Sequence, residues 1–247
     1  MTTYKHDNIV PDKLSYLSKK EQVAKMFDNI AIKYDFLNRF LSAGIDVGWR
    51  KKGIKHLKEV NPSIILDVAT GTADVAILSN KILNPKKVIG IDISEGMLSI
   101  GRKKIQHLTL SDKIELLTGD SESINFEDNY FDAVTVSFGV RNFQDLEKGL
   151  NEIKRVLKPG GKLMVLEFSK PQMPLIKFIY SFYMKKITPG IGKLFSKNKN
   201  AYSYLDESIK NFPEGKEFVK ILDKTGYKTT YHKPLTFGIC SIYCGKK

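Results

Sequence analysis

Polar and small residues follow the first strongly apolar run of the chain, at a place where they could hold a ligand. The run at 63–68 contains Asp67, and Gly71 and Thr72 follow before a helix that we expect to begin at Asp74. Small residues in such a turn let the backbone approach a ligand closely at the carboxyl end of a strand. The two aspartates would repel phosphate groups, but they suit a cofactor that carries an ammonium and a sulfonium charge.

Three later apolar runs end in residues of the same kind. Asp92 closes the second run, Asp120 and Ser121 follow the third, and Ser137 ends the fourth. Asp92 stands 21 residues after Gly71, where a carboxylate can accept both hydroxyls of a ribose. We expect Asp120 and Ser121 at an adenine and Ser137 in the wall of the pocket. Each residue alone could instead cap a helix or form a turn, but four successive strand ends together favour one ligand site.

These residues predict S-adenosylmethionine as the cofactor rather than a dinucleotide. A dinucleotide fingerprint needs three glycines in the order G-x-G-x-x-G, whereas Gly71 is followed two positions later by Ala73. The histidines are scattered and share no metal-ligand spacing with Cys240 and Cys244, so no metal site is predicted. The two cysteines lie in a strand-like tail and are expected to be free, buried thiols.

The order of the apolar runs predicts the architecture. Short apolar runs alternate with amphipathic stretches from residue 63 to 168, which is typical of βαβ units and a parallel sheet. Two β-type runs, at 226–233 and 237–245, are joined by only three residues and must pair antiparallel. Five parallel strands followed by such a hairpin indicate the α/β fold of class I methyltransferases, a Rossmann-like sheet of seven strands. Helices are expected at 19–41, 46–58, 95–107, 144–157, Pro174–Ile187, Tyr202–Phe212 and Gly215–Lys224.

A chain of 247 residues with this pattern is expected to form a single domain. No run approaches about 20 apolar residues, and the N-terminus is polar where a signal peptide is apolar, so we expect a cytoplasmic protein. The formal net charge of +13 suits a nucleic acid or an acidic membrane surface, although solvated lysines would give the same charge. The predicted parts are a helical N-terminal lid at 1–58, a cofactor-binding core at 63–168, a helical insertion facing substrate and membrane at 170–224, and the terminal hairpin at 225–247.

Four further stretches form a recognisable set. They are Tyr34–Ser42 with Trp49 beyond it, Ser137–Asn142, Arg155–Leu163 continuing to Glu167–Ser169, and Tyr202–Ile209. With them the sequence resembles the ubiquinone/menaquinone biosynthesis C-methyltransferase family over nearly its whole length. Two positions depart from the family pattern, because Leu37 stands where the family usually has methionine and Asp46 where it usually has histidine. The second departure questions any proton-transfer role at that position.

The resemblance implies C-methylation of a quinol ring by S-adenosylmethionine. Demethylmenaquinol, which would become menaquinol, is favoured by the breadth of the family, and a benzoquinol of the ubiquinone route is the alternative. An RNA methyltransferase is an alternative of another class, but no Asn/Asp-Pro-Pro-aromatic motif follows the fourth run, so no nucleic-acid partner is expected. In relatives the cofactor is held by positions that match Thr72, Asp92, Asp120, Ser121 and Ser137.

Ring methylation needs a carbon nucleophile, which a quinol supplies when a hydroxyl proton is lost, so a polar group is required beside the ring. Arg141 and Asn142 follow the fourth strand and are predicted to orient the quinol oxygen or a water molecule. Arg141 would stabilise the phenolate electrostatically, or would instead pair with a local carboxylate such as Asp145. Tyr34, in the lid, could hydrogen-bond or stack at the cofactor, with ordinary packing as the alternative.

The segment Phe168–Leu205 contains no acidic residue, but it contains seven lysines and several aromatic residues. Such a basic segment suits the surface of an anionic bilayer, where a polyprenyl quinol would be presented. We therefore expect peripheral contact with the inner face of the cell membrane; a helix packed on the domain with solvated lysines is the alternative. Near the end of the segment, Tyr202 and Tyr204 are candidates for lining the substrate tunnel, or else for packing in the core.

Overall fold

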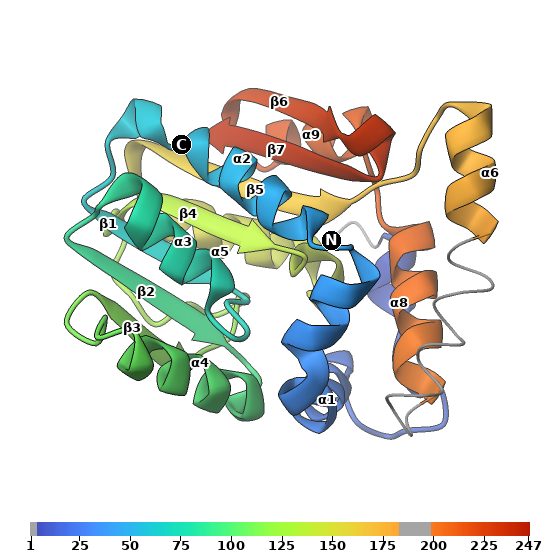
Figure 1. Cartoon of the computed structure of the whole chain (residues 1–247). Coiled ribbons are helices and arrows are strands. Elements are labelled where there is room, and N and C mark those ends of the chain that lie inside the picture. The colour runs from blue at the N-terminus through green and yellow to red at the C-terminus, as the bar shows by residue number, and fades with distance from the viewer. Residues whose placement is uncertain (1–3, 183–198) are drawn as a thin grey trace.

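Nearly continuous burial along the central strands determines the layers of the fold. The computed structural model describes residues 4–182 and 199–247. In β1 (Ile64–Val68), Ile65 packs in one apolar cluster and the next residue, Leu66, packs in another on the opposite face of the sheet. Strands that are apolar on both faces require helices on both faces. The sheet accordingly lies between two layers of helices (Figure 1).

The described residues form a seven-stranded sheet with the order β3-β2-β1-β4-β5-β7-β6. The first five strands are parallel to their neighbours, whereas β7 pairs antiparallel with both β5 and β6. The predicted class I methyltransferase sheet with a terminal antiparallel hairpin is thus confirmed. The other strands are β2 (Lys87–Asp92), β3 (Ile114–Thr118), β4 (Phe131–Ser137), β5 (Leu157–Phe168), β6 (Lys228–Leu235) and β7 (Cys240–Lys246).

The helices α2, α3 and α4 cover one face of the sheet, and α5 and α9 cover the other (Figure 1). Short polar side chains begin two of them: Ser94 caps α4, and Asp145 caps α5 by accepting a hydrogen bond of 2.9 Å from the N–H of Lys148. The bounds are α2 (Ile45–Lys55), α3 (Asp74–Leu83), α4 (Glu95–His107), α5 (Leu146–Val156) and α9 (Lys216–Lys224).

Three helices lie at the end of the sheet where the parallel strands finish. α1 (Lys19–Leu41) begins with a capping box, in which the side chains of Ser18 and Glu21 each bond the other's backbone N–H. It packs beside α8 (Lys199–Asn211), and α6 (Pro174–Phe182) stands further out, away from the sheet (Figure 1). No described helix is long and apolar enough to cross a membrane.

The predicted connection between the last two strands was wrong by a few residues. β6 continues through Pro234, which pairs with Ser241, and the connection is the short helix η5 (Thr236–Gly238) instead of 234–236. Proline is tolerated there because β6 is an edge strand.

One predicted helix ends earlier than expected. α2 ends at Lys55 rather than at 58, and a separate turn, η2 (Lys58–Val60), follows it. The end of the predicted helix Pro174–Ile187 lies outside the described residues. The two cysteines are free and buried, as predicted.

Candidate active site

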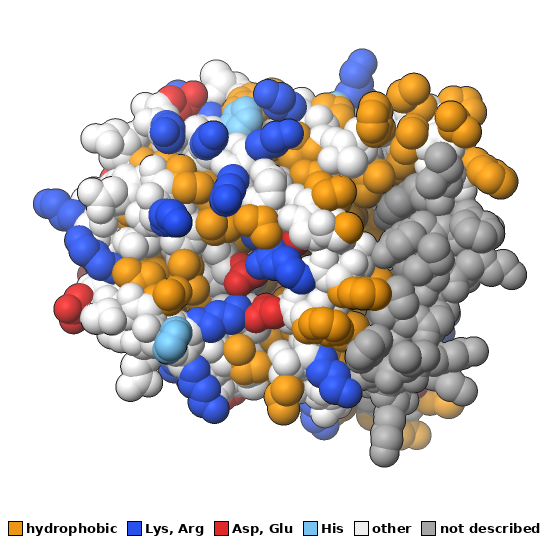
Figure 2. Space-filling view, in the orientation of Figure 1, with side chains coloured by type: hydrophobic (Ala, Val, Ile, Leu, Met, Phe, Trp, Pro, Cys, Tyr) orange, Lys and Arg blue, Asp and Glu red, His pale blue; other side chains and the backbone are white. Residues whose placement is uncertain are grey.

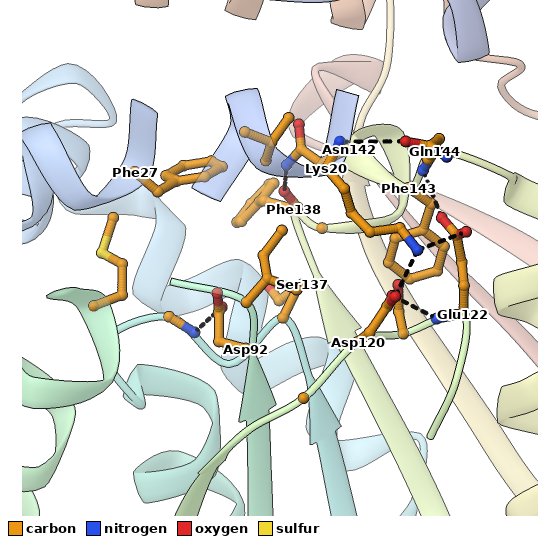
Figure 3. A pocket seen from close by; sticks show the side chains of 18 of the residues that line it. Lys20, Phe27, Asp92, Asp120, Glu122, Ser137, Phe138, Asn142, Phe143 and Gln144 are labelled. Carbon is orange, nitrogen blue, oxygen red and sulfur yellow. Dashed lines mark hydrogen bonds and ion pairs between the residues drawn. The ribbon is translucent and has the colours of Figure 1, made fainter. Parts of the chain in front are cut away.

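A pocket opens at the carboxyl ends of the central parallel strands, beneath α1 (Figure 3). It encloses about 650 Å³, including the open space at its mouth. The sequence pattern predicted that the polar residues at the ends of the strands lie at one edge of the sheet. In the structure, most of these side chains line one pocket. The predicted cofactor residues that line it are Gly71, Asp92, Asp120, Ser121 and Ser137.

Asp92 is held in place by the backbone of two loops. The N–H of Gly71 donates to its Oδ2 at 2.8 Å, and the N–H of Ser94 donates to its Oδ1 at 2.9 Å. Gly71 has a φ of 55°, in the left-handed region that favours glycine. Burial raises the pKa of the Asp92 carboxyl, and the backbone donors act in the opposite direction. Each oxygen keeps a lone pair that can accept a hydrogen bond from a ligand hydroxyl.

Ser137 presents a polar atom in the floor of the pocket. Its Oγ is buried and has no hydrogen-bond partner among the described residues. The backbone beside it is close-packed, because a Cβ at Gly139 would lie only 2.6 Å from the Cβ of Ala69. Buried hydroxyls normally have a partner, so Ser137 is suited to bond a polar group of a ligand.

Lys20 of α1 was not predicted from the sequence, although it reaches across the pocket to a predicted residue (Figure 3). Its Nζ lies 2.5 Å from Oδ2 of Asp120 and 3.1 Å from Oε2 of Glu122. Asp120 also accepts a hydrogen bond of 2.9 Å from the N–H of Glu122. α1 therefore closes this end of the pocket through an ion pair. Apolar walls complete the lining, with Phe27, Ile93, Met97, Phe138 and Phe143.

A second, smaller hollow adjoins the pocket and shares Tyr34 and Ser137 with it. Its lining is shorter and includes three charged residues, Arg50, Asp67 and Asp74. The Nε of Arg50 is buried and has no hydrogen-bond partner among the described residues. One cation and two carboxylates complement the carboxylate and the ammonium of an amino acid. Arg50 is thus a candidate ligand residue that sequence analysis missed.

Two predicted cofactor residues in this hollow already bond other side chains. Asp67 is 1% exposed and accepts hydrogen bonds from the hydroxyls of Thr135, at 2.5 Å, and Thr70, at 2.6 Å. Burial raises the pKa of Asp67 to about 6 despite these donors. The hydroxyl of Thr72 donates to Oδ1 of Asp35 at 2.6 Å and so ties the loop to α1.

An ion-pair network fixes α1 over the second hollow. Oδ2 of Asp35 lies 2.5 Å from Nζ of Lys104, and Arg39 contacts both Asp46, at 2.5 Å, and Asp74, at 2.8 Å. Asp46, which replaces the usual family histidine, is 3% exposed and also pairs with the neighbouring Arg50. In this chain the position therefore belongs to an ionic network. No group of three or more metal-ligating side chains occurs among the described residues.

Arg141 follows β4 as predicted, but its ion-pair partner is not Asp145. Its Nη1 donates to the carbonyl of Phe138 at 2.7 Å and to Oε1 of Glu167 at 2.6 Å. Asp145 is unavailable because it caps α5. Arg141 is 5% exposed and lies outside the residues that line the pocket, whereas Asn142 is part of the lining.

The predicted tyrosines occupy different places. Tyr34 lines both hollows and meets the ring of Phe27 edge to face, with 5.9 Å between centroids. Tyr204 is 3% exposed, packs against α1, and donates from its hydroxyl to Oδ1 of Asn142 at 3.0 Å. Tyr202 lies on α8, but its side chain is outside the described part of the structure.

Comparisons with known proteins place the chain in one group. It is 49% identical over 229 residues to the demethylmenaquinone methyltransferase of Bacteroides fragilis, over 93% of this chain and 94% of that protein. It is 44% identical over 230 residues to the ubiquinone/menaquinone biosynthesis C-methyltransferase UbiE of Geobacter sulfurreducens, over 93% and 90% of the two chains.

Among solved structures, the fold is similar to a SAM-dependent methyltransferase from Thermotoga maritima, described as a possible histamine N-methyltransferase. The TM-score is 0.62 at 20% identity, over 90% of this chain and 99% of that chain, a likeness that concerns the fold alone. The sequence model of the ubiE/COQ5 methyltransferase family matches residues 16–247. The chain therefore belongs to the ubiE/COQ5 methyltransferase family.

Proposed function

We propose that this protein transfers the methyl group of S-adenosylmethionine to a ring carbon of demethylmenaquinol and so forms menaquinol. Family membership over residues 16–247 supports the reaction, and the relative named demethylmenaquinone methyltransferase supports the substrate. The observation that carries the proposal is that two hollows adjoin. The larger one, with apolar walls, matches an adenosyl group, and the smaller one, with Arg50, Asp67 and Asp74, matches an amino-acid tail.

The lining residues fit the parts of S-adenosylmethionine in turn. Asp92 would accept the ribose hydroxyls, and the apolar walls beside Ser121 would hold the adenine. Ser137, whose Oγ has no partner among the described residues, would bond a polar group near the junction of the two hollows. Arg50 and Asp67 would face the carboxylate and the ammonium of the methionyl group. We propose this arrangement as the cofactor site, with Thr72 and Asp120 holding its walls through their contacts with α1.

When bound, the cofactor supplies a methyl group that its sulfonium already activates. The task of the protein is then to hold the quinol carbon in line with that methyl group and to favour loss of the hydroxyl proton. Asn142 lies in the pocket lining and is oriented by the hydroxyl of Tyr204. Together with Tyr34, it forms the proposed contact surface for the quinol head group. Arg141, which precedes Asn142 in the chain, lies outside the pocket lining and would act on the quinol from beside that surface. A benzoquinol is the second candidate, because the name of the Geobacter relative covers both quinones.

The reaction can be tested with purified protein and labelled S-adenosylmethionine. Reduced demethylmenaquinone, a reduced benzoquinone that lacks the same methyl group, and total RNA are supplied in parallel under anaerobic conditions. We expect label in the product of the first substrate, with slower or no labelling of the second. Label in RNA alone would overturn the proposed function.

We further propose that α6 brings the protein to an anionic membrane surface, where the lipid quinol resides. Three large apolar side chains in α6 or directly before it are strongly exposed: Met173 is 55% exposed, Leu175 is 68% and Phe178 is 71%. Figure 2 shows hydrophobic side chains gathered over α6. Lys177 lies among them, and no acidic residue occurs from Phe168 to Leu205. Exposed apolar side chains combined with positive charge are suited to an anionic bilayer interface.

The double variant Leu175→Ser/Phe178→Ser should weaken binding to vesicles that contain anionic lipid by about tenfold to a hundredfold. Full burial of each side chain is worth roughly 1.5–3 kcal/mol, of which an interface recovers part. Co-sedimentation measures the loss, and methylation of a short-chain, water-soluble quinol should stay unchanged. A matched control is Leu108→Ser/Leu117→Ser, which removes two exposed leucines, Leu108 directly after α4 and Leu117 in β3, 50% and 36% exposed. Equal loss in both variants, or loss in neither, would contradict the role of α6.

A further inference from the structure

A buried ion pair lies next to two residues of the proposed quinol site, because its arginine, Arg141, precedes Asn142 in the chain and donates to the carbonyl of Phe138. Glu167, at the end of β5, is fully buried, and Arg141 is 5% exposed. The two are 2.6 Å apart, from Nη1 to Oε1, and the guanidinium lies over the ring of Phe168 at 5.5 Å. The register of the sheet creates this meeting, because Ser137 of β4 pairs with Leu166 of β5. A buried acidic residue in the apolar run of β5 is costly unless it is paired and hydrogen-bonded.

The pair leaves one donor and one acceptor unused. The Nε of Arg141 and the Oε2 of Glu167 are buried and have no hydrogen-bond partner among the described residues. A buried donor or acceptor without a partner is costly, and more so when it is charged. A hydroxyl group can satisfy both, since its hydrogen donates to a carboxylate while its oxygen accepts from a guanidinium. The quinol substrate carries such hydroxyls on its ring.

We propose that Glu167 is the base of the methylation: it receives the quinol hydroxyl proton, directly or through one water molecule, while Arg141 becomes the counter-ion of the phenolate. The inference rests on the proposed function, because it requires a quinol at the site. Arg141 itself is a poor base, since the guanidinium stays protonated in proteins. Glu167 is the carboxylate that the structure places against it.

The exchange of partners keeps the buried charge balanced. Before the reaction Arg141 is neutralised by Glu167, and afterwards it is neutralised by the phenolate while Glu167 is uncharged. No unpaired charge is created in a water-poor site, where such a charge is expensive. Burial raises the pKa of Glu167, which makes the carboxylate a better proton acceptor, although the adjacent guanidinium opposes the rise.

The bonds change in three steps. The hydroxyl proton moves to Oε2 of Glu167, and the electron pair stays on the quinol oxygen. The adjacent ring carbon then bonds the methyl group with electrons delocalised from the phenolate oxygen, while the methyl–sulfur bond breaks and the electron pair of that bond stays on sulfur. The ring carbon loses its own proton to solvent, and the proton held on Glu167 returns to the oxygen. One proton is released in total, and the carboxylate is ready for another turnover.

The ionisable groups around Glu167 allow a pH test. Burial raises the pKa values of Tyr204, Cys240 and Tyr243 above their ordinary ranges, that of Tyr243 to about 12, so these groups stay protonated near neutral pH. Lys19, whose pKa burial lowers to about 8, donates to the carbonyl of Arg141 at 3.5 Å. Its titration occurs with or without Glu167, so a difference between variants isolates Glu167.

We expect Glu167→Gln to lower kcat near neutral pH by about 10²- to 10⁴-fold, the usual contribution of a positioned base. The kcat of the unaltered protein should rise with pH through the pKa of Glu167 and then level off, because the base must be ionised. In the variant this plateau should vanish, and kcat should keep rising by about tenfold per pH unit as hydroxide replaces the carboxylate. Glu167→Asp should restore the plateau with a lower maximum.

Controls distinguish this role from structural support. Thermal melting and calorimetric titration with S-adenosylmethionine should show that the Glu167→Gln protein is folded and binds the cofactor. Glu152→Gln breaks a similar carboxylate–arginine pair, with Arg155 at 2.9 Å in α5, and should leave the pH profile unchanged. An equal loss at every pH in Glu167→Gln would overturn the base assignment, whereas absence of quinol turnover by the unaltered protein would reject the proposed function itself.

Discussion

Replacing Asp92 by alanine should weaken the binding of S-adenosylmethionine by a factor of about 100 to 10,000. The carboxylate is positioned to accept two hydroxyls of the ribose, and hydrogen bonds to a charged group contribute roughly 1.5–3 kcal/mol each. The loss of about 3–6 kcal/mol corresponds to that factor, because each 1.4 kcal/mol changes affinity about tenfold. Calorimetric titration of the two proteins measures the difference directly.

A control is needed because Asp92 also holds the backbone of Gly71 and Ser94. Asp28 of α1 supports the same region, accepting hydrogen bonds from the hydroxyl of Ser94 at 2.6 Å and the N–H of Gly96 at 2.9 Å, and it does not line the pocket. Asp28→Ala should therefore weaken binding by less than about tenfold, which corresponds to the free energy lost when one helix-capping interaction is removed. Unchanged affinity in Asp92→Ala would contradict the ribose assignment, and equal losses in both variants would assign the effect to loop order.

The sheet and its ligand edge were predictable because their signals are local in the sequence. Each apolar run is short and ends in a polar residue, so the parallel order of the strands brings Asp92, Ser121 and Ser137 together without knowledge of any contact. The hairpin was equally clear, since two adjacent β-type runs leave little choice of pairing. Its connection was misplaced because Pro234 reads as a turn residue, whereas an edge strand accepts proline.

The residues that α1 and α2 contribute were not predictable in the same way. Lys20 and Arg50 lie on amphipathic helices, where a basic residue usually faces solvent. Their approach to the site depends on how the helices pack over the sheet, and Lys20 meets Asp120 across 100 residues of sequence. Asp46 shows the same limit, because its replacement of histidine becomes intelligible only once Arg39 and Arg50 are seen beside it.

The partner of Arg141 illustrates how local reasoning fails. Asp145 is only four residues away, but the start of α5 uses its carboxylate as a cap. Glu167 is 26 residues away and meets Arg141 through the pairing of β4 with β5. A signal was present, because an acidic residue in the apolar run KLMVLEF must find a partner or a function when it is buried. The sequence does not say which cation would reach it.

Replacing Arg141 by alanine should lower kcat by about 10²- to 10³-fold, the usual cost of removing one donor that stabilises a developing oxyanion. The affinity for S-adenosylmethionine should change little, because Arg141 lines neither hollow. The variant should also lose about 3–5 kcal/mol of stability, since Glu167 would remain buried without its partner. Initial rates with the quinol, calorimetric titration and urea denaturation measure the three quantities separately.

The double variant Arg141→Met/Glu167→Gln separates catalysis from stability. It removes both charges while keeping side chains of similar size, so most of the stability lost in Arg141→Ala should return, as replacing a whole buried ion pair is often neutral. Turnover should not return, because neither the counter-ion of the phenolate nor the base is present. Recovery of turnover together with stability would mean that Arg141 and Glu167 only support the fold. Since the two residues are in contact, their effects on kcat should be far from additive, and the double variant should be about as slow as the slower single variant.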